Sequence, residues 1–288
     1  MADLSDYQLD WNGFLLGAGT VYELVQLDGW IDSPGLTNGA APRSTRHGSW
    51  PGGMRGQART VTATLEIVAD GAGMGPAIRA LRAATPIVRS AAQGSLAICC
   101  DGETLVAAAK FAGRIVPVDQ PYSMGYVPQA TVQWYCADPR LYEPAEQSVT
   151  IGAPTGGSGG LVYPLAYPLV YGTAPVPNTA TCINTGNAET NPLVTFTGPL
   201  TVPRLVNGTL GWALIFDIDL PAGQTLIVDT DRGTALLNGT TDRLDTRSNL
   251  GVPVEYFELA PGPNDLSLLA EAFGEGAQVT VRWKSASM

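Results

Sequence analysis

Residues 130–142 read ATVQWYCADPRLY, and this stretch decides how the chain is divided. The apolar residues Val132, Trp134 and Cys136 alternate with a Thr, a Gln and a Tyr, which is the period of a strand with one apolar face. The strand is expected to end before Pro139, because proline has no amide hydrogen for a ladder and restricts the residue before it to extended or turn geometry. We therefore predict one domain up to the end of this stretch and a second domain after it.

The composition is that of an ordered, mainly β protein. Of the 288 residues, 45% are hydrophobic and only 15% are charged, which is too apolar and too weakly charged for a disordered chain. The length is enough for two domains of ordinary size. The 34 glycines and 22 prolines separate short apolar runs, a pattern that favours strands joined by turns over long helices.

The charge balance excludes some partners. The formal charge is −10, so a grip on nucleic-acid phosphates or on anionic membranes is not expected. No apolar run approaches the ~20 residues of a membrane span, and the polar, acidic start of the chain does not resemble a signal peptide. The low charged fraction leaves large uncharged surfaces, which indicates that partners cover some of them.

The N-terminal domain is predicted over residues 1–145, as a β-barrel or sandwich-like fold with one helix. The helix is expected over about 74–85, with Pro76 in its first turn and Pro86 ending it. A hairpin is expected with its turn at Asp101-Gly102. The expected strands of this domain are Tyr22–Leu27, Thr60–Val68, Leu96–Cys100 and Thr104–Ala109.

The segment Ile31–Gly56 differs from its surroundings. It is poor in apolar residues and rich in Gly, Pro, Ser, Asn and Arg, and we expect a loop without secondary structure. Such a long loop is unusual in a compact domain, so it is either a mobile arm or a segment ordered by a neighbour. Together with edge-strand pairing, it supplies our candidates for a subunit interface, which are Arg43, Arg46, His47, Trp50, Arg55 and Arg59.

The second half predicts a β-sandwich of jelly-roll type over residues 181–288, preceded by a linker and an extended segment over 146–180. Short apolar runs recur between turn signals such as Asn238-Gly239, at the spacing typical of a two-sheet sandwich. The expected strands are Leu193–Thr197, Leu200–Val206, Trp212–Leu220, Thr225–Asp229, Thr234–Leu237, Val254–Leu259, Asp265–Leu269 and Gln278–Trp283.

The sequence predicts no enzyme and no cofactor. His47 is the only histidine, no G-x-S-x-G motif accompanies it, and an interface or structural role is favoured over catalysis. Asp217 and Asp219 share a strand face and could serve glycoside hydrolysis, but a solvent-exposed strand face has the same pattern. The four cysteines form no C-x-x-C motif and are expected to be small buried apolar residues, so we expect neither a disulfide framework nor a metal site.

An alternative function is carbohydrate binding by the C-terminal domain. Aromatic side chains stack on sugar rings, although aromatic residues on strands more often pack in the core. The candidates for contacts with host cell-wall glycans are Trp212, Tyr256 and Trp283.

Four features of the chain resemble one family over nearly its full length. They are the Arg46-His47-Gly48 loop ahead of the strand RTVTATLEI (59–67), the single helix PAIRALRAAT (76–85), the closing WYCADPRLY (134–142), and AGQTLIVDTDRGTALLNG (222–239) followed by EYFELAPGPNDL (255–266). In these features the chain is similar to the distal tail proteins of long, flexible-tailed bacteriophages, the siphovirus tail-component group.

The resemblance implies a structural role in the virion, at the tail tip, for a protein made in the host cytoplasm. It implies an N-terminal ring, usually a hexamer, and a C-terminal galectin-like sandwich outside it. It also implies partners: further copies of the chain, the tail tube protein, the hub or tail-associated lysin-like protein, the tape measure protein and a receptor-binding protein. The acidic balance suits a channel that passes DNA without holding it, so we expect an acidic or neutral lumen.

Overall fold

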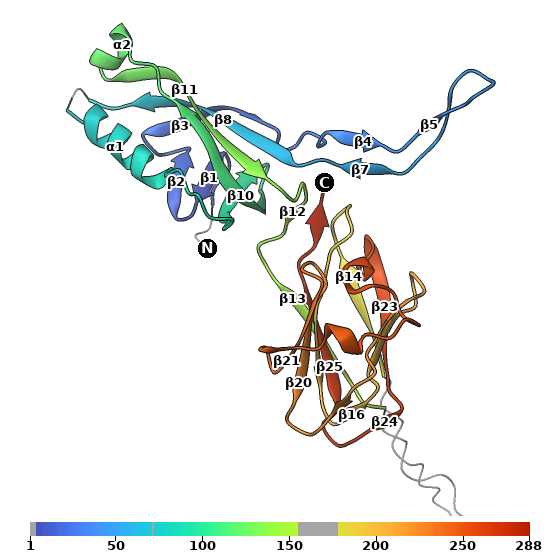
Figure 1. Ribbon diagram of the computed structural model, residues 1–288. Helices are drawn as coiled ribbons and strands as arrows, with labels where there is room; N and C mark the ends of the chain where they lie inside the picture. The colour runs from blue at the N-terminus through green and yellow to red at the C-terminus, as the bar shows by residue number, and fades with distance from the viewer. Residues whose placement is uncertain (1–3, 71, 155–177) are drawn as a thin grey trace, which may run out of the picture. The chain divides into compact units, whose positions relative to one another are not determined.

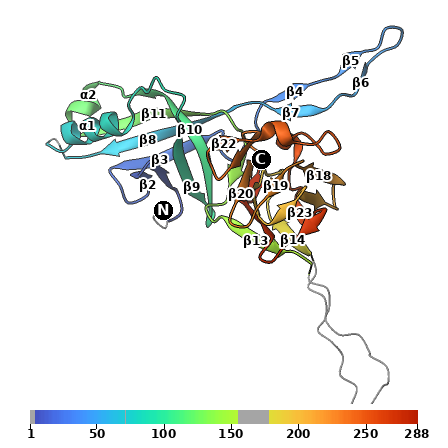
Figure 2. The same ribbon diagram turned by 60° about the horizontal axis from the view of Figure 1, so that its bottom comes forward.

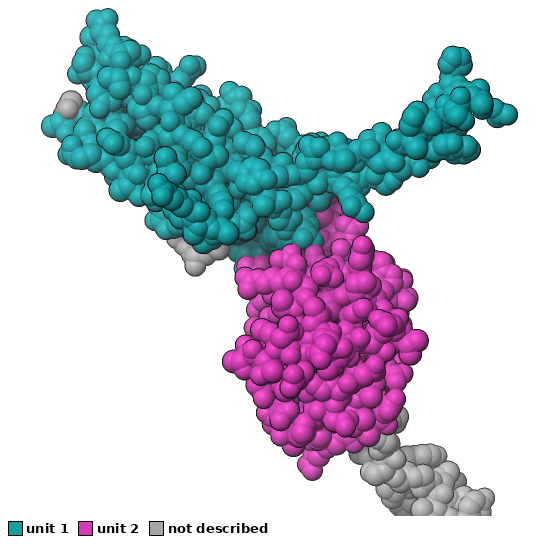
Figure 3. Space-filling view, viewed as in Figure 1, with its two compact units in different colours: residues 1–144, 288 teal, residues 145–287 magenta. Residues whose placement is uncertain are grey.

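The computed structural model describes residues 4–70, 72–154 and 178–288, and nearly all of its regular structure is β-strand (Figure 1). The chain divides into two compact units, which Figure 3 colours separately. Unit 1 comprises residues 1–144 with residue 288, and unit 2 comprises residues 145–287. The prediction of a mainly β fold is confirmed, and each unit is described by itself below.

Unit 1 is organised by one antiparallel path of strands, in the order β2-β1-β9-β10-β11-β8-β3. The β9–β10 hairpin turns at Asp101-Gly102, both with positive φ, as the sequence predicts. The bounds are β1 Gln8–Trp11, β2 Phe14–Gly17, β3 Tyr22–Asp28, β8 Arg59–Val68, β9 Gly94–Cys100, β10 Glu103–Ile115, β11 Tyr126–Cys136 and β12 Leu141–Tyr142.

Strand β11 is an interior strand of that path and lies between β10 and β8. Val132, Trp134 and Cys136 are fully buried, as their alternation predicts. Trp134 lies opposite Val61 of β8, and its ring centroid is 6.0 Å from that of Trp11. The apolar face of the organising strand is therefore the centre of the unit 1 core.

Helix α1 (Met74–Ala84) closes the core of unit 1 at one side. It buries Met74, Ala77 and Leu81, which recur at helical spacing. Two aromatic side chains of the sheet hold its backbone: the Tyr22 hydroxyl donates to the Ala77 carbonyl at 2.7 Å, and the Trp11 indole donates to the Ala84 carbonyl at 3.0 Å. These two bonds fix both the middle and the end of the helix against the strands.

A second, one-turn helix, α2 (Gln120–Ser123), lies between β10 and β11, although the sequence predicts only one helix in this domain. The Asp119 side chain accepts a hydrogen bond from the Tyr122 amide at 3.2 Å, and Pro121 occupies the first turn. Both are helix-start signals, but a four-residue helix is too short to show an apolar period.

The segment predicted as an unstructured loop is a β-hairpin, which we call the arm (residues 33–57). Its paired strands are β4 (Leu36–Asn38) with β7 (Met54–Gly56), and β5 (Ala41–Pro42) with β6 (Ser49–Trp50). The arm extends away from the sheet of unit 1 (Figures 1 and 2). Every residue of these four strands is exposed, so neither face carries the apolar alternation by which a strand is recognised.

Unit 2 is a sandwich built on two main antiparallel sheets, in the orders β13-β25-β15-β20-β21-β22 and β14-β23-β17-β18, with a short sheet β19-β16-β24. Its strands are β13 Gln147–Gly152, β14 Thr179–Asn184, β15 Leu193–Thr197, β16 Leu200–Thr201, β17 Arg204–Asn207, β18 Trp212–Ile215, β19 Asp219–Leu220, β20 Thr225–Asp229, β21 Thr234–Leu237, β22 Thr241–Asp242, β23 Gly262–Leu269, β24 Ala272–Phe273, β25 Gln278–Trp283 and β26 Ala286–Ser287.

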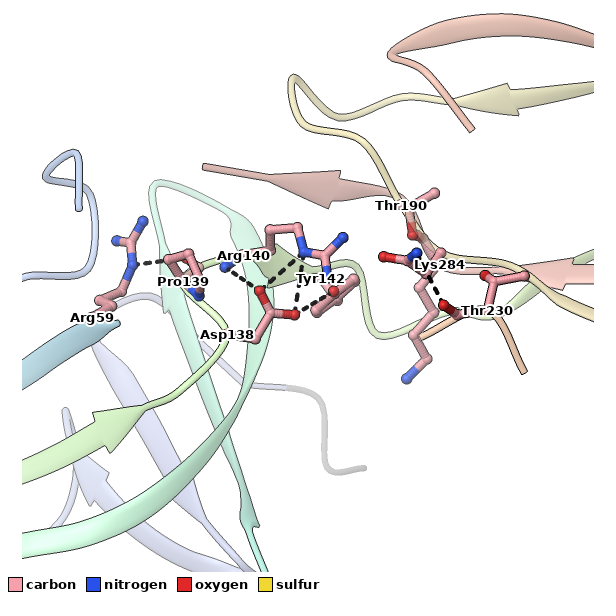
Figure 4. Close-up of polar contacts among 9 residues, drawn as sticks. Arg59, Asp138, Pro139, Arg140, Tyr142, Thr190, Thr230 and Lys284 are labelled. Carbon is pink, nitrogen blue, oxygen red and sulfur yellow. Dashed lines mark hydrogen bonds and ion pairs between the residues drawn. The ribbon is translucent and has the colours of Figure 1, made fainter. Parts of the chain in front are cut away.

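The core of unit 2 lies between its sheets. Phe196 and Phe216 are fully buried and pack edge to face, with ring centroids 6.2 Å apart. The hydroxyl of the buried Thr190 donates to the Lys284 carbonyl at 2.7 Å, which joins two distant segments of the unit (Figure 4).

Several predicted boundaries in this half are wrong. Strand β13 lies in the stretch predicted as linker and pairs with β25, whereas the extended segment predicted over 161–176 lies outside the described residues. The predicted strand Val254–Leu259 begins as a 3-10 turn, Val254–Tyr256. Pro203, which cannot donate to a ladder, lies between β16 and β17 and divides the predicted strand Leu200–Val206. A further 3-10 turn spans Leu244–Thr246.

Candidate interaction surfaces

The arm is a basic and partly apolar surface on an acidic chain. It carries Arg43, Arg46 and Arg55 and contains no Asp or Glu, although the whole chain has a formal charge of −10. Trp50 is 62% exposed and Met54 is 66% exposed, which is unusual for large apolar side chains. The Arg43 guanidinium lies 4.6 Å from the centre of the Trp50 ring, so the two side chains form one cation–π unit.

The predicted interface residues do not all lie on this surface. Arg43, Arg46, His47, Trp50 and Arg55 are exposed residues of the arm. Arg59, the first residue of β8, is only 3% exposed. The prediction that Arg59 contacts another subunit is therefore wrong, since its guanidinium is used inside unit 1.

The Arg59 guanidinium holds the base of the arm. Its Nη1 donates to the carbonyls of Gly29 and Asp32, at 3.0 and 3.1 Å, and also to that of Trp30. Its Nε donates to the Pro139 carbonyl at 3.0 Å (Figure 4). Burial lowers the pKa of Arg59, while Cys136 and Asp32 act in the opposite direction. One buried cation thus joins the chain entering the arm to the segment that follows β11.

That following segment, ADPRLY, forms its own polar cluster. The Asp138 carboxylate accepts from the amide and Nε of Arg140, at 3.1 and 3.0 Å, and from the Tyr142 hydroxyl at 2.6 Å (Figure 4). The Arg140 guanidinium also lies 5.7 Å from the centre of the Tyr142 ring. The motif that carries much of the resemblance is therefore a structural brace, because these side chains bond to one another.

The outward face of strands β3, β8 and β11 is acidic. Its polar and charged side chains include Glu23, Asp28 and Glu66 and no Lys or Arg, among Thr, Gln and Tyr residues. Glu23 lies directly opposite Glu66, a like-charge pair that weakens a sheet. A hydrogen bond to Glu66 raises the pKa of Tyr126 on the same face. This face is unsuited to binding nucleic-acid phosphates.

The aromatic residues proposed to contact glycans do not form a stacking surface. Trp283 is 5% exposed, belongs to the core of unit 2, and donates its indole hydrogen to the Ile183 carbonyl at 3.0 Å. Trp212 is half-buried against the same core, whereas Tyr256 is 62% exposed. The prediction of a glycan contact is wrong for Trp283, because its ring is not accessible.

The cysteines behave as apolar core residues, as the sequence predicts. Cys99, Cys136 and Cys182 are buried and Cys100 is half-buried, all as free thiols. Burial raises the pKa of Cys136 to about 11 and that of Cys182 to about 12.

Within residues 4–70, 72–154 and 178–288, no three His, Cys, Asp or Glu side chains are grouped so that they could hold a metal ion. Over the same ranges, no helix has the length and apolar character needed to cross a membrane.

Comparisons with known proteins bear on the resemblance. Residues 185–286 match the family model described as "Siphovirus-type tail component, C-terminal domain". The whole chain is similar to the Dit protein of phage SPP1, with 13% identity and a TM-score of 0.65, over 98% of this chain and 99% of that one. A chain of the phage P2 baseplate in its activated conformation with Ca matches with 10% identity and a TM-score of 0.50, over 96% of both chains.

No curated protein matches this chain. The resemblance to the siphovirus tail-component group is nevertheless confirmed for residues 185–286 by the family model, and the whole chain has the fold of SPP1 Dit.

Proposed function

We propose that this chain is a structural component of a bacteriophage tail tip. Its copies form a ring, a hexamer, that joins the tail tube to the tip hub and to the parts that attach to the host. The observation that carries the proposal is the match of residues 185–286 to a siphovirus-type tail component, together with the fold that the whole chain shares with SPP1 Dit. That protein is described as a paradigm of the hub adsorption apparatus in phages infecting Gram-positive bacteria.

The proposed partners are further copies of the chain, the tail tube protein, the hub or tail-associated lysin-like protein, the tape measure protein and a receptor-binding protein. The chain acts within the virion by contact, and no catalytic step is assigned to it. Pull-down of the purified chain with each purified tail protein, one at a time, tests these contacts directly.

The arm supports the ring, because it has little reason to be ordered alone. A two-stranded hairpin is marginally stable in water, and the arm buries none of the residues of its four strands. Docking against an acidic neighbour would bury Trp50 and Met54 and neutralise Arg43, Arg46 and Arg55. A second copy of this chain, with its formal charge of −10, is such a neighbour.

The acidic face of β3, β8 and β11 supports a lumen that passes DNA. Glu23, Asp28 and Glu66 repel phosphates, whereas a basic lining would bind DNA tightly and in a salt-dependent way. We place this face toward the lumen of the ring. A map of the surface potential of the assembled ring tests this placement, and a basic lumen would refute it.

The ring itself is tested by light scattering and negative-stain electron microscopy of the purified chain. We expect ring-shaped oligomers, which the arm variant Arg43→Glu, Arg46→Glu, Arg55→Glu should fail to form while keeping its melting temperature. The matched control is Arg232→Glu, a charge reversal at an exposed arginine of unit 2. A wild-type chain that stays strictly monomeric at high concentration would overturn the proposal.

A further inference from the structure

A groove in unit 1 lies at the C-terminal end of helix α1. It has a volume of about 490 Å³. Its walls include Trp11, Phe14, Pro86, Val88, Lys110 and Phe111. At its edge Val88 is 60% exposed, and the neighbouring Ile87 is 90% exposed. Two branched apolar side chains exposed beside an apolar groove indicate a contact surface.

Basic residues adjoin this groove, and one of them, Lys110, is a wall residue. Arg82 and Arg89 are the sequence neighbours of wall residues, and the Arg114 guanidinium lies 5.8 Å from the Phe111 ring. Burial lowers the pKa of Arg114, and Arg82 lowers it further. The Arg114 guanidinium donates to the hydroxyl of Thr85, at the end of α1. Lys110 donates to the Ser90 carbonyl at 3.1 Å.

One carboxylate adjoins the groove by the same sequence criterion, that of Asp10 beside Trp11, which accepts from the Gly13 amide at 2.6 Å. Between Asp70 and Asp101 the sequence contains no acidic residue. In the part of the chain that the structure describes, none of the four groove cations forms an ion pair. The basic groove, defined as the wall residues above with Arg82, Arg89 and Arg114, therefore carries a net positive charge on an acidic protein.

A surface of opposite character lies at the N-terminal end of the same helix. We call it the acidic tip, formed by Val68, Asp70, Val118, Asp119 and Met124. Val118 is 78% exposed, Met124 is 71% exposed and Val68 is 51% exposed. The segments are held together because Val68 pairs with Tyr126 and the Ala69 amide donates to the Gly125 carbonyl at 3.0 Å.

The segments that form the tip carry no cation of their own, and the Arg79 guanidinium, beside Gly75 in the first turn of α1, offsets part of the tip's negative charge. The sequence contains no Lys or Arg in residues 60–78 or in residues 115–139, which supply the whole tip. Tip and groove cannot meet within one chain, because helix α1 separates them by about 16 Å, from its 11 residues at 1.5 Å each. Each surface thus needs a partner with the properties of the other.

We propose that the acidic tip of one copy of this chain docks in the basic groove of the next copy. Val118 and Met124 would enter the apolar groove, and the carboxylates of the tip would face its arginines. Such a contact uses two different patches, so it is heterologous and closes into a ring when its rotation permits. This docking contact rests on the proposed function in one respect, since it takes the neighbour to be a second copy of the chain in the ring. It is separate from the contact that we propose for the arm.

Two other occupants of the groove fit less well. The arm of a second copy is basic, so it would be repelled by the cations of the groove. Nucleic acid would use the cations but not the apolar walls, and it would leave the exposed apolar side chains of the tip without a role. The second copy is the occupant that satisfies the charge and the apolar surface of both patches.

A charge-swap mixture tests the contact. The groove variant is Val88→Glu, Arg89→Glu, and the tip variant is Val118→Lys, Met124→Lys. All four positions lie at the surface, and no hydrogen bond of their side chains is lost. Assembly is measured by analytical ultracentrifugation of each variant alone and of an equimolar mixture. Leu250→Glu, at an 86% exposed position of unit 2, is the matched control.

We expect each variant alone to associate at least tenfold more weakly than the wild type, and the mixture to recover assembly with alternating subunits. A role in folding alone would not produce this recovery, and melting curves confirm that each variant is folded. Variants that assemble like the wild type, or folded variants that stay apart when mixed, would overturn the docking contact while leaving the ring intact. A monomeric wild type would overturn both the ring and the docking contact. If the wild type bound a DNA duplex and the groove variant did not, the groove would be assigned to nucleic acid instead.

Discussion

Replacing Arg59 should loosen two distant segments of unit 1 together. Arg59 is 3% exposed, and its guanidinium donates to four backbone carbonyls, those of Gly29, Trp30, Asp32 and Pro139. In Arg59→Met these carbonyls lose a charged donor, and each unsatisfied buried group costs about 1–3 kcal/mol. Removing the buried cation offsets part of this loss, because its desolvation also costs several kcal/mol.

We therefore expect Arg59→Met to lower the free energy of unfolding of unit 1 by about 2–4 kcal/mol. Arg59→Lys keeps the charge but not the planar fork, so about half of that loss is expected to remain. Arg43→Met is the matched control, since Arg43 is an exposed arginine of the arm and loses only its cation–π contact with Trp50, which changes stability by about 1 kcal/mol or less.

Hydrogen exchange followed by mass spectrometry provides the assay, because it separates the two units. In Arg59→Met, amides of residues 29–32 and of residues 138–140 should exchange faster together, while those of α1 follow the global stability of unit 1. A loss of protection in only one of the two segments would show that Arg59 does not join them. A destabilisation no larger than that of Arg43→Met would refute the energetic argument.

Three further predictions concern the core and the brace. Trp134→Ala should destabilise unit 1 by about 3–5 kcal/mol. Trp134→Phe should cost much less, because the buried indole nitrogen has no hydrogen-bond partner in the described part of the chain. Equal losses of stability for the two variants, measured by hydrogen exchange, would contradict this prediction. Tyr142→Phe removes the 2.6 Å hydrogen bond to Asp138 and should lower the free energy of unfolding by about 1 kcal/mol, measured by urea titration. Tyr256→Phe, at an exposed tyrosine, is the control. In the folded state the pKa of Cys136 is about 11 and that of Cys182 is about 12, both above the ordinary value of 9.0, so the stability that the buried neutral thiols contribute is complete below pH 9 and is lost as the pH rises toward these values. Between pH 8 and pH 10 the wild type should therefore lose about 1 kcal/mol of unfolding free energy per thiol more than the double variant Cys136→Ala, Cys182→Ala. Equal pH profiles of the two proteins would disprove this prediction.

The arm and the basic groove have different parts in this account of assembly. Both are basic, so both seek acidic neighbours, but the arm is a hairpin with every strand residue exposed, whereas the groove is a concave surface beside the core. Loss of the arm contact and loss of the groove contact should therefore be separable, and the two sets of variants distinguish them.

The elements that sequence predicts well are those whose periodicity follows burial. Strand β8 and the end of β11 alternate because one face is in the core, and α1 shows buried residues at helical spacing. The strands of the arm are not predicted, for the opposite reason. A hairpin that is exposed on both sides has no apolar period, so its backbone pairing cannot be recognised from the order of its side chains.

The role of single residues was harder to predict than the elements that carry them. Arg59 follows the arm in the sequence and looks like one of its arginines, yet it is the residue that holds the base of the arm from inside. Trp283 looks like a candidate to stack on sugars, yet its strand turns that side chain into the core. In both cases the side-chain type suits either environment, since Arg and Trp each combine a polar group with a large apolar body.

By itself, the order of residues in this chain determined a mainly β protein, the division after ADPRLY, the buried face of the organising strand, and the absence of a motif for catalysis. These follow from local periods and from composition, which act over a few residues. Only the tertiary structure decided that the acidic tip and the basic groove lie at opposite ends of one helix, because strands far apart in the chain bring their residues together there. Complementarity between surfaces is a property of this long-range assembly, and no short stretch of sequence encodes it.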